Sequence, residues 1–402
     1  MQYRDILEAT RLTRAGQLGQ ATALLQRALR GEKAADEATA SAPQASTSRI
    51  INVTPHQPSS VDEQAFGSAP NFLGKGMTGI GSPSYMPEAL RSLLERVKSG
   101  LGSVKPSAVP AQDIVPDGGR FISGSYSNQA GTRAYKLYIP SGYAGQAVPL
   151  VVMLHGCTQS SEDFAAGTRM NVIAEEHTCL VAYPEQSAAA NASRCWNWFR
   201  PGDQQRDQGE PSLIAGITRQ VTRDYPVDLH RIYVAGLSAG GAAATILGMT
   251  YPDLYSAVGV HSGLACGVAS DLPSAFAAMR QGTAGISVIE GRERIIPTIV
   301  FHGDRDTTVH PRNGDHVIAQ SNIITSMQTD VHRGRVPGGH AYTRTLYIDA
   351  GGCAVLERWE VHGAGHAWSG GSPLGSYTDP RGPDASREMV RFFLSHSRIA
   401  NS

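Results

Sequence analysis

Arg231-Ile-Tyr-Val-Ala-Gly-Leu-Ser-Ala-Gly-Gly241 joins a predicted strand, a G-x-S-x-G motif and the start of a predicted helix. Residues 232–235 form a short apolar run rich in β-formers, which indicates a buried strand. Residues 242–247 are mostly small and apolar and indicate a buried helix. A serine in a tight turn between a strand and a helix exposes its hydroxyl at the helix N-terminus, where free N–H groups favour a developing anion. We therefore predict that Ser238 is a catalytic nucleophile.

The two glycines of the motif belong to the same prediction. A Cβ atom at Gly236 or Gly240 would collide with the neighbouring strand or helix, because the turn is tight. The chain contains 44 glycines, so a G-x-S-x-G match can also arise by chance. The flanking strand and helix, together with the partner motifs below, favour the catalytic interpretation of Ser238.

The composition describes a chain of 402 residues with room for one large domain and additional segments. Hydrophobic residues make up 41% of the chain, enough for a sizeable core, and the formal net charge is zero. This balance argues against a nucleic-acid or membrane-surface partner. No apolar run is long enough for a transmembrane segment. Residues 1–8 lack the basic and then apolar pattern of a secretory signal, so we expect a cytoplasmic location.

The first 117 residues differ in composition from the rest of the chain. Leucine and isoleucine at helical spacing predict a helical hairpin over residues 1–30. One hairpin cannot bury its own apolar face. Residues 2–30 are therefore either a solubilising, self-docking extension or an element for targeting, granule association or self-association. Residues 31–117 are rich in small and polar residues and predict a flexible linker, with a short amphipathic helix over residues 88–98.

Residues 118–398 form the predicted catalytic domain. Residues 121–126 and 135–139 predict an antiparallel opening pair that turns around residues 128–131. Apolar runs follow, alternating with helical patterns such as that near residues 164–176. The runs are residues 149–154, 179–183, 232–235, 255–260, 297–301 and 355–361. The alternation predicts an α/β fold with a mostly parallel central sheet covered on both faces.

A second motif, Leu154-His-Gly-Cys-Thr-Gln159, follows directly after a predicted buried strand. Acyl transfer through a tetrahedral intermediate requires N–H donors for the oxyanion. We assign these to the backbones of Cys157 and Ala239 and interpret the Cys157 side chain as an inert buried thiol. The five cysteines are too scattered for a disulfide framework, and no C-x-x-C spacing indicates zinc. Cys195 and Cys266 are the pair we would expect to bridge in an oxidising compartment.

A third motif, Val300-Phe-His-Gly-Asp-Arg-Asp306, also follows a predicted strand. A catalytic histidine needs a carboxylate that fixes its tautomer and stabilises the imidazolium. We choose Asp306 for this role. Asp304 is the alternative, although it is better placed to form the turn after the strand.

The histidine itself is expected in the loop after the last strong strand, in Val361-His-Gly-Ala-Gly-His-Ala-Trp368. We choose His366, with His362 as a competitor and His340 as a weaker one. The order serine, aspartate, histidine along the chain matches that of the α/β-hydrolase fold. A zinc pair formed by the two histidines of this segment is disfavoured, because there is no H-E-x-x-H motif and the segment is too rich in glycine for a helix.

Five segments together resemble the poly(3-hydroxybutyrate) depolymerase family of esterases, which also includes feruloyl- and acetylxylan-type carbohydrate esterases. They are His155-Gly-Cys-Thr-Gln159, Tyr183-Pro-Glu-Gln186, Cys195-Trp-Asn-Trp-Phe199, Gly236-Leu-Ser-Ala-Gly-Gly241 and Gly365-His-Ala-Trp368. The resemblance covers residues 118–398 and implies an α/β-hydrolase fold without a metal or organic cofactor. It also implies the triad Ser238, Asp306 and His366, with Cys157 and Ala239 as oxyanion donors. Many polymer depolymerases of the family have a signal peptide, so the resemblance also allows an extracellular location.

The function that follows is a serine carboxylic-ester hydrolase acting through an acyl-enzyme, with poly(3-hydroxybutyrate) or another polyhydroxyalkanoate as the expected substrate. The main alternative is a feruloyl- or acetylxylan-type esterase, or an esterase of small soluble esters. A serine peptidase or thioesterase on the same fold and a granule-associated binding protein are further alternatives. Trp196, Trp198 and Trp368 lie in the motif loops and either anchor these loops or form an aromatic wall for the substrate.

Overall fold

The computed structural model describes residues 114–282, 295–321 and 327–398. The chain divides into two units, residues 1–82 and 83–402, and every described residue belongs to the second. The predicted hairpin, linker and short amphipathic helix all lie outside the described residues. Among the described helices, none has the length and apolar character needed to cross a membrane.

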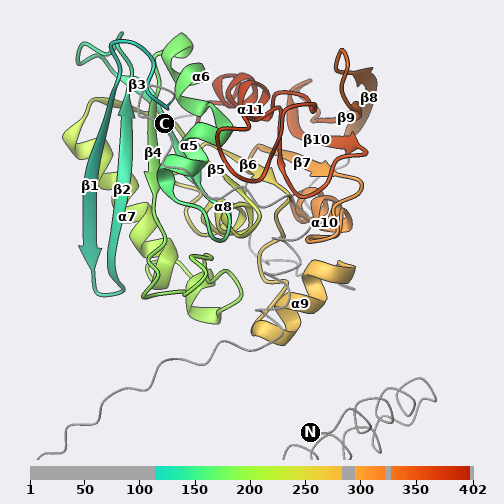
Figure 1. The fold of residues 1–402 in the computed structure, drawn as a ribbon, viewed down its shortest axis with the longest axis horizontal. Helices are drawn as coiled ribbons and strands as arrows, with labels where there is room; N and C mark the ends of the chain where they lie inside the picture. Colours follow the sequence, from blue (N-terminus) through green and yellow to red (C-terminus); the bar gives the residue numbers. More distant parts are fainter. Residues whose placement is uncertain (1–113, 283–294, 322–326, 399–402) are drawn as a thin grey trace, which may run out of the picture. The chain divides into compact units, whose positions relative to one another are not determined.

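A central sheet of ten strands runs through the described part of the chain (Figure 1). Its strands are β1 (Arg120–Asn128), β2 (Gly131–Ile139), β3 (Val148–Leu154), β4 (Leu180–Pro184), β5 (Val227–Leu237), β6 (Ala257–His261), β7 (Thr298–Gly303), β8 (Gln328–Arg335), β9 (Ala341–Ile348) and β10 (Ala354–His362). Their order is β1-β2-β4-β3-β5-β6-β7-β10-β9-β8. In this spatial order, the five pairings from β4 to β10 are parallel. The pairings at the two edges of the sheet are antiparallel. The predicted α/β fold with a mostly parallel sheet and an antiparallel opening pair is confirmed.

Helices cover both faces of this sheet (Figure 1). They are α5 (Ser161–Thr168), α6 (Met170–His177), α7 (Gly209–Asp224), α8 (Ala239–Thr250), α9 (Leu272–Gln281), α10 (Arg312–Ser321) and α11 (Ala385–Leu394), with a short 3-10 helix, η1 (Pro201–Gln204), and a two-stranded pair, β11 (Trp368–Ser369) and β12 (Thr378–Asp379). Helices α7, α8 and α10 contribute to one hydrophobic cluster, and α5, α6 and α11 contribute to the other. Alternate residues of the central strands enter the two clusters, as Val152 and Met153 of β3 do. Strands buried on both faces explain the continuous apolar runs of the sequence.

Two features of the chain differ from the sequence prediction. The single helix predicted near residues 164–176 is wrong, because the chain breaks at Arg169, whose φ of 55° ends α5 and begins α6. The hairpin of β8 and β9 was not predicted at all. Nearly all side chains of β8 are exposed, so this strand lacks the apolar pattern that marks the others.

The turn between β5 and α8 generates a stability prediction. A Cβ atom at Gly240 would lie 2.1 Å from the carbonyl oxygen of Leu154 and 2.6 Å from that of His155. Backbone atoms cannot move aside cheaply, so we expect Gly240→Ala to lower the free energy of unfolding by about 3 kcal/mol or more. Thermal or urea unfolding followed by circular dichroism would measure the loss. Gly202→Ala in η1 is the control, since a Cβ there meets no atom within 4 Å; equal stability of the two variants would contradict the prediction.

Candidate active site

Ser238 occupies the sharp turn between the end of β5 and the start of α8. Its backbone angles are φ 58° and ψ −118°, a region that residues with a side chain rarely adopt. The turn is stabilised by a hydrogen bond from the Ser238 N–H to the carbonyl oxygen of His261 (2.9 Å). Gly236 is needed just before it, since a Cβ there would lie 2.3 Å from the carbonyl oxygen of Gly240. Ser238 is half-buried and lines a cavity. Its strained backbone therefore holds an accessible hydroxyl.

Asp306 and His366 form a hydrogen-bonded pair beside this turn. The Nδ1 atom of His366 lies 2.7 Å from Oδ2 of Asp306. The other carboxylate oxygen of Asp306 accepts hydrogen bonds from the N–H groups of Thr308 (2.9 Å) and Val309 (2.8 Å). Burial by itself would raise the pKa of Asp306, but the adjacent imidazoles of His366 and His302 outweigh it and hold that pKa well below its usual value. Asp306 is therefore ionised at neutral pH.

A second histidine, His302 of β7, contacts the same carboxylate. Its Nε2 atom lies 3.4 Å from Oδ2 of Asp306 and 2.8 Å from the carbonyl oxygen of Val309. Both partners accept hydrogen bonds, so Nε2 must carry the proton. No role for His302 was predicted from the sequence. The signal that was available is the spacing of four residues between His302 and Asp306.

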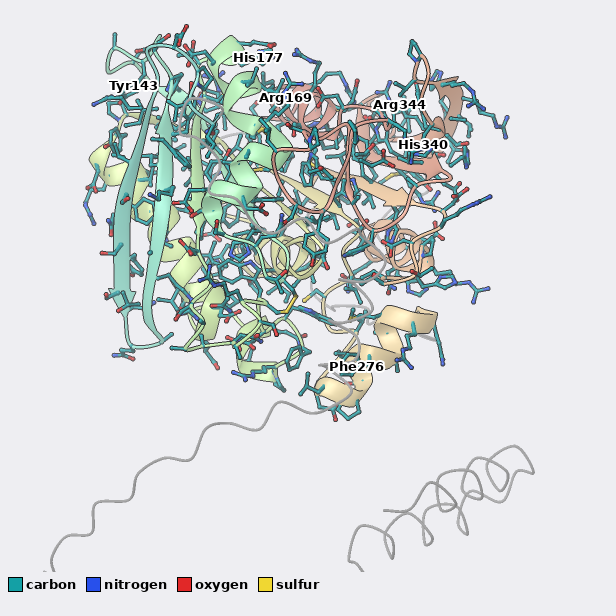
Figure 2. The ribbon with its side chains drawn as sticks, viewed as in Figure 1. Tyr143, Arg169, His177, Phe276, His340 and Arg344 are labelled. Carbon is teal, nitrogen blue, oxygen red and sulfur yellow. A yellow bond between two sulfur atoms is a disulfide. The ribbon has the colours of Figure 1, made fainter. Side chains whose placement is uncertain are left out.

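The rival carboxylate and the rival histidines are engaged elsewhere. Asp304 and His362 pair with each other at 3.1 Å near the surface, with side chains that are 33% and 38% exposed. His340, labelled in Figure 2, lies 2.7 Å from Asp379. None of these residues is among those that line the cavity beside Ser238. His362 and His366 thus serve two different carboxylates, which gives no support to a shared zinc site.

The predicted oxyanion donors lie on two adjacent segments of the cavity wall. Ala239 is the first residue of α8, so its N–H has no acceptor within the helix. Cys157 lies in the turn after β3 and lines the same cavity as Ser238. On either side of it, Gly156 N–H donates to Oε1 of Gln159 (2.9 Å) and Thr158 N–H donates to the carbonyl oxygen of Ser193 (2.7 Å). These bonds fix the turn that presents the Cys157 backbone to the cavity.

A disulfide joins Cys157 to Cys195, whose Cα atoms are 4.2 Å apart. Two interpretations from the sequence are therefore wrong: Cys157 is not a free thiol, and Cys195 does not pair with Cys266. The carboxyl ends of the adjacent parallel strands β3 and β4 lie at one edge of the sheet, and the segments that follow them carry these two cysteines. Sequence spacing does not reveal this neighbourhood. The bond ties the turn that contains Cys157, here called the oxyanion turn after its predicted role, to the segment that follows β4.

The cavity beside Ser238 has a volume of about 110 Å³. Its lining residues are Gly156, Cys157, Asn191, Cys195, Trp198, Phe199, Leu237, Ser238, Ala239, Leu264, Leu272, Ala275, Phe276, Met279, Thr308, Val309, His366 and Tyr377. One space is therefore lined by Ser238 in its sharp strand-to-helix turn (the serine elbow), by His366 and by both predicted oxyanion residues. No Asp, Glu, Lys or Arg belongs to this lining in the part of the chain that the structure describes, so the cavity suits an uncharged ligand.

The three tryptophans that were expected either to anchor their loops or to form an aromatic wall differ in position. Trp198 lines the cavity. Trp196 is fully buried and donates from Nε1 to the carbonyl oxygen of His155 (3.1 Å). Trp368 is also buried and stacks on His261, with ring centroids 5.1 Å apart. The burial of Trp196 and Trp368 favours the loop-anchoring alternative for these two residues, and the position of Trp198 leaves the aromatic-wall alternative to that residue.

The fold and the serine elbow define a member of the α/β-hydrolases. The family model described as esterase PHB depolymerase matches residues 133–337, and the chain belongs to this family of carboxylic-ester hydrolases.

Individual relatives act on different esters, according to their names. Poly(3-hydroxyalkanoate) depolymerase C of Paucimonas lemoignei is 30% identical over 257 residues, which are 61% of this chain and 60% of that protein. The chain thus spans less than two thirds of the depolymerase. Feruloyl esterase B of Neurospora crassa is 27% identical over 258 residues, 60% of this chain and 85% of that protein. The structure of an acetyl xylan esterase from Aspergillus awamori shares the fold, with a TM-score of 0.51 at 19% identity over 61% of this chain and 94% of that one.

The disulfide generates a prediction about the oxyanion turn. The bond closes a loop of 38 residues, so the double variant Cys157→Ser/Cys195→Ser should lose about 3 to 4 kcal/mol of stability. Because the turn that carries the Cys157 N–H loses its covalent tether, we also expect kcat on a soluble butyrate ester to fall by at least about tenfold.

The measurement compares kcat and far-ultraviolet circular dichroism at a temperature where the variant is still folded. Cys353→Ser is the control, because Cys353 is exposed and does not line the cavity. A folded double variant with unchanged kcat would show that the disulfide does not position the donor.

Proposed function

We propose that this protein is a serine carboxylic-ester hydrolase that acts through an acyl-enzyme, with poly(3-hydroxybutyrate) or a related polyhydroxyalkanoate as its substrate. One observation carries the catalytic part: the strained Ser238 and the Asp306-bound His366 line the same cavity. The family membership and the depolymerase relative support the substrate.

In the proposed mechanism, Asp306 fixes the tautomer of His366. The carboxylate can only accept, so Nδ1 of His366 carries the proton and Nε2 is the basic nitrogen. His366 takes the hydroxyl proton as Oγ of Ser238 attacks the ester carbonyl carbon, and the imidazolium that forms is stabilised by the ionised Asp306. The backbone N–H groups of Cys157 and Ala239 stabilise the oxyanion.

Collapse of the tetrahedral intermediate breaks the ester C–O bond, and His366 protonates the departing alcohol. A water molecule then enters, gives a proton to His366 and attacks the acyl-enzyme carbonyl. The second collapse releases the acid, and the proton returns from His366 to Oγ of Ser238.

A carbohydrate esterase is the second candidate function, because Feruloyl esterase B is a relative and because Trp198 and Phe199 offer aromatic surface in the cavity. Both functions share the nucleophile and differ in the ester that fills the cavity.

We also infer that the protein works in an oxidising compartment. Disulfides persist in such compartments and are rare in the cytoplasm. The bond between Cys157 and Cys195 favours this location over the cytoplasmic one that the sequence alone indicates. Granule association through residues 2–30 stays a prediction.

The triad assignment is tested with matched pairs of variants. We expect Ser238→Ala and His366→Ala to lower kcat on a soluble butyrate ester by roughly 10⁶-fold, and Asp306→Asn by roughly 10⁴-fold. Asp304→Asn and His362→Ala change the same residue types in the surface pair and should retain wild-type kcat. Ser238→Ala with wild-type turnover, or an equal loss in the surface pair, would refute the assignment.

The substrate assignment is tested on amorphous poly(3-hydroxybutyrate) granules, with hydroxybutyrate oligomers detected by mass spectrometry. We expect release by the wild-type protein and none by Ser238→Ala. Hydrolysis of acetylated xylan or a feruloyl ester without release from granules would favour the carbohydrate esterase. Activity restricted to thioesters or peptide amides would indicate a thioesterase or a peptidase.

A further inference from the structure

Helix α9 presents an apolar stripe to the cavity beside Ser238. Leu272, Phe276 and Met279 follow the spacing i, i+4, i+7 and therefore share one face of the helix. All three line the cavity, together with Ala275 from the same face. Figure 2 labels Phe276 on this helix, at the end of the molecule where α9 lies. The stripe is only half-buried, so large apolar side chains are available to a ligand.

Small side chains, a helix cap and backbone hydrogen bonds supply most of the contacts that hold α9 in place. Its two buried residues are the small Ala275 and Ala278. A capping box fixes its first turn, in which Asp271 accepts from the Ser274 N–H (2.8 Å). At its other end, the carbonyl oxygen of Met279 accepts from the N–H of His310 (2.7 Å) and that of Ala278 from the Asn313 side chain (3.0 Å). Met279 also packs against the hydrophobic core, whereas among the described residues Leu272 and Phe276 are not part of that packing. The Phe276 ring is thus not required to dock the helix.

Further residues of the cavity lining are also apolar. Leu264 and Val309 line it, and Val309 belongs to the loop whose backbone binds Asp306. A packing explanation alone would bury large apolar side chains on a solvent-facing helix against the core, whereas here they border an open space next to a nucleophile. The arrangement fits the apolar chain of an ester whose carbonyl group lies at Ser238.

We propose that the stripe of α9 binds the apolar chain of the ester substrate and that Phe276 sets the longest chain the cavity accepts. The proposal rests on the ester hydrolase function above and adds a residue that determines its specificity. Phe276 is the largest member of the stripe, and its side chain has few rotatable bonds. Met279 has three and can adapt to chains of different shape. A methylene group that reaches the stripe should raise kcat/KM by about fourfold, and one that meets the Phe276 ring should gain nothing.

The test uses two substrate series and variants that change the cavity in opposite directions. One series varies the acyl chain of p-nitrophenyl esters from acetate to dodecanoate, and the other varies the alkyl group of butyrate esters from methyl to octyl. We expect Phe276→Ala to move the optimum of one series at least two carbons longer and Phe276→Trp to move it shorter. The series that responds identifies whether the acyl or the alcohol chain meets α9. Arg280→Ala, an exposed residue of the same helix outside the cavity lining, should leave both profiles unchanged.

The outcomes separate this proposal from the function on which it rests. Thermal unfolding first shows which variants are folded, and a single folded Phe276 variant is sufficient to decide. Unchanged profiles in both series, with ester hydrolysis intact, would overturn the role of α9 alone. Absence of ester hydrolysis by the wild-type protein, with every ester of both series and with the granules, would overturn the proposed function and this inference together.

Discussion

The close approach of the turn after β5 to the end of β3 is the constraint on which the site depends. The two strands pair in register, with Leu154 opposite Gly236, and a Cβ at Gly240 would overlap the carbonyl oxygen of Leu154. The residues just after Leu154 form the oxyanion turn that contains Cys157. The close contact of Gly236 and Gly240 with the backbone of Leu154 therefore sets the position of Ser238 relative to both expected oxyanion donors. The sheet makes this geometry rigid because its strands are buried on both faces.

Buried histidines support this geometry without taking part in proton transfer. Nε2 of His155 accepts from the Gln186 N–H (3.0 Å), and Nε2 of His261 accepts from the Ser369 N–H (2.9 Å). Burial lowers the pKa of His155 to about 4 and that of His261 to about 3, so both are neutral acceptors at physiological pH. His366, by contrast, borders the cavity and is bound to an ionised carboxylate. The environments of these histidines thus assign them different tasks.

Features that depend on local sequence could be predicted, and features that depend on strand order could not. The β5 strand, the elbow at Ser238 and the parallel strands follow from apolar runs and glycine positions, which act over a few residues. The Cys157–Cys195 bond depends on β3 and β4 being neighbours, which no spacing in the chain reveals. The break at Arg169 is a single left-handed residue inside a helical pattern. Asp306 was preferred to Asp304 because of its place in the motif and the family resemblance, whereas its burial beside two imidazoles appears only in three dimensions.

The same distinction separates the proposed chemistry of this molecule from its proposed specificity. Ser238, Asp306 and His366 lie just beyond β5, β7 and β10, where the parallel sheet fixes their relative positions. Much of the cavity wall comes instead from the disulfide-tethered segment after β4 and from α9. In the sequence, α9 lies between β6 and β7. Such connecting segments can change length and sequence without disturbing the strand ends. Under the proposed function, a change in the wall would alter which ester fits, while the strand ends would keep the reacting groups in place. This expectation agrees with a family whose members are named for polyester, feruloyl and acetylxylan substrates.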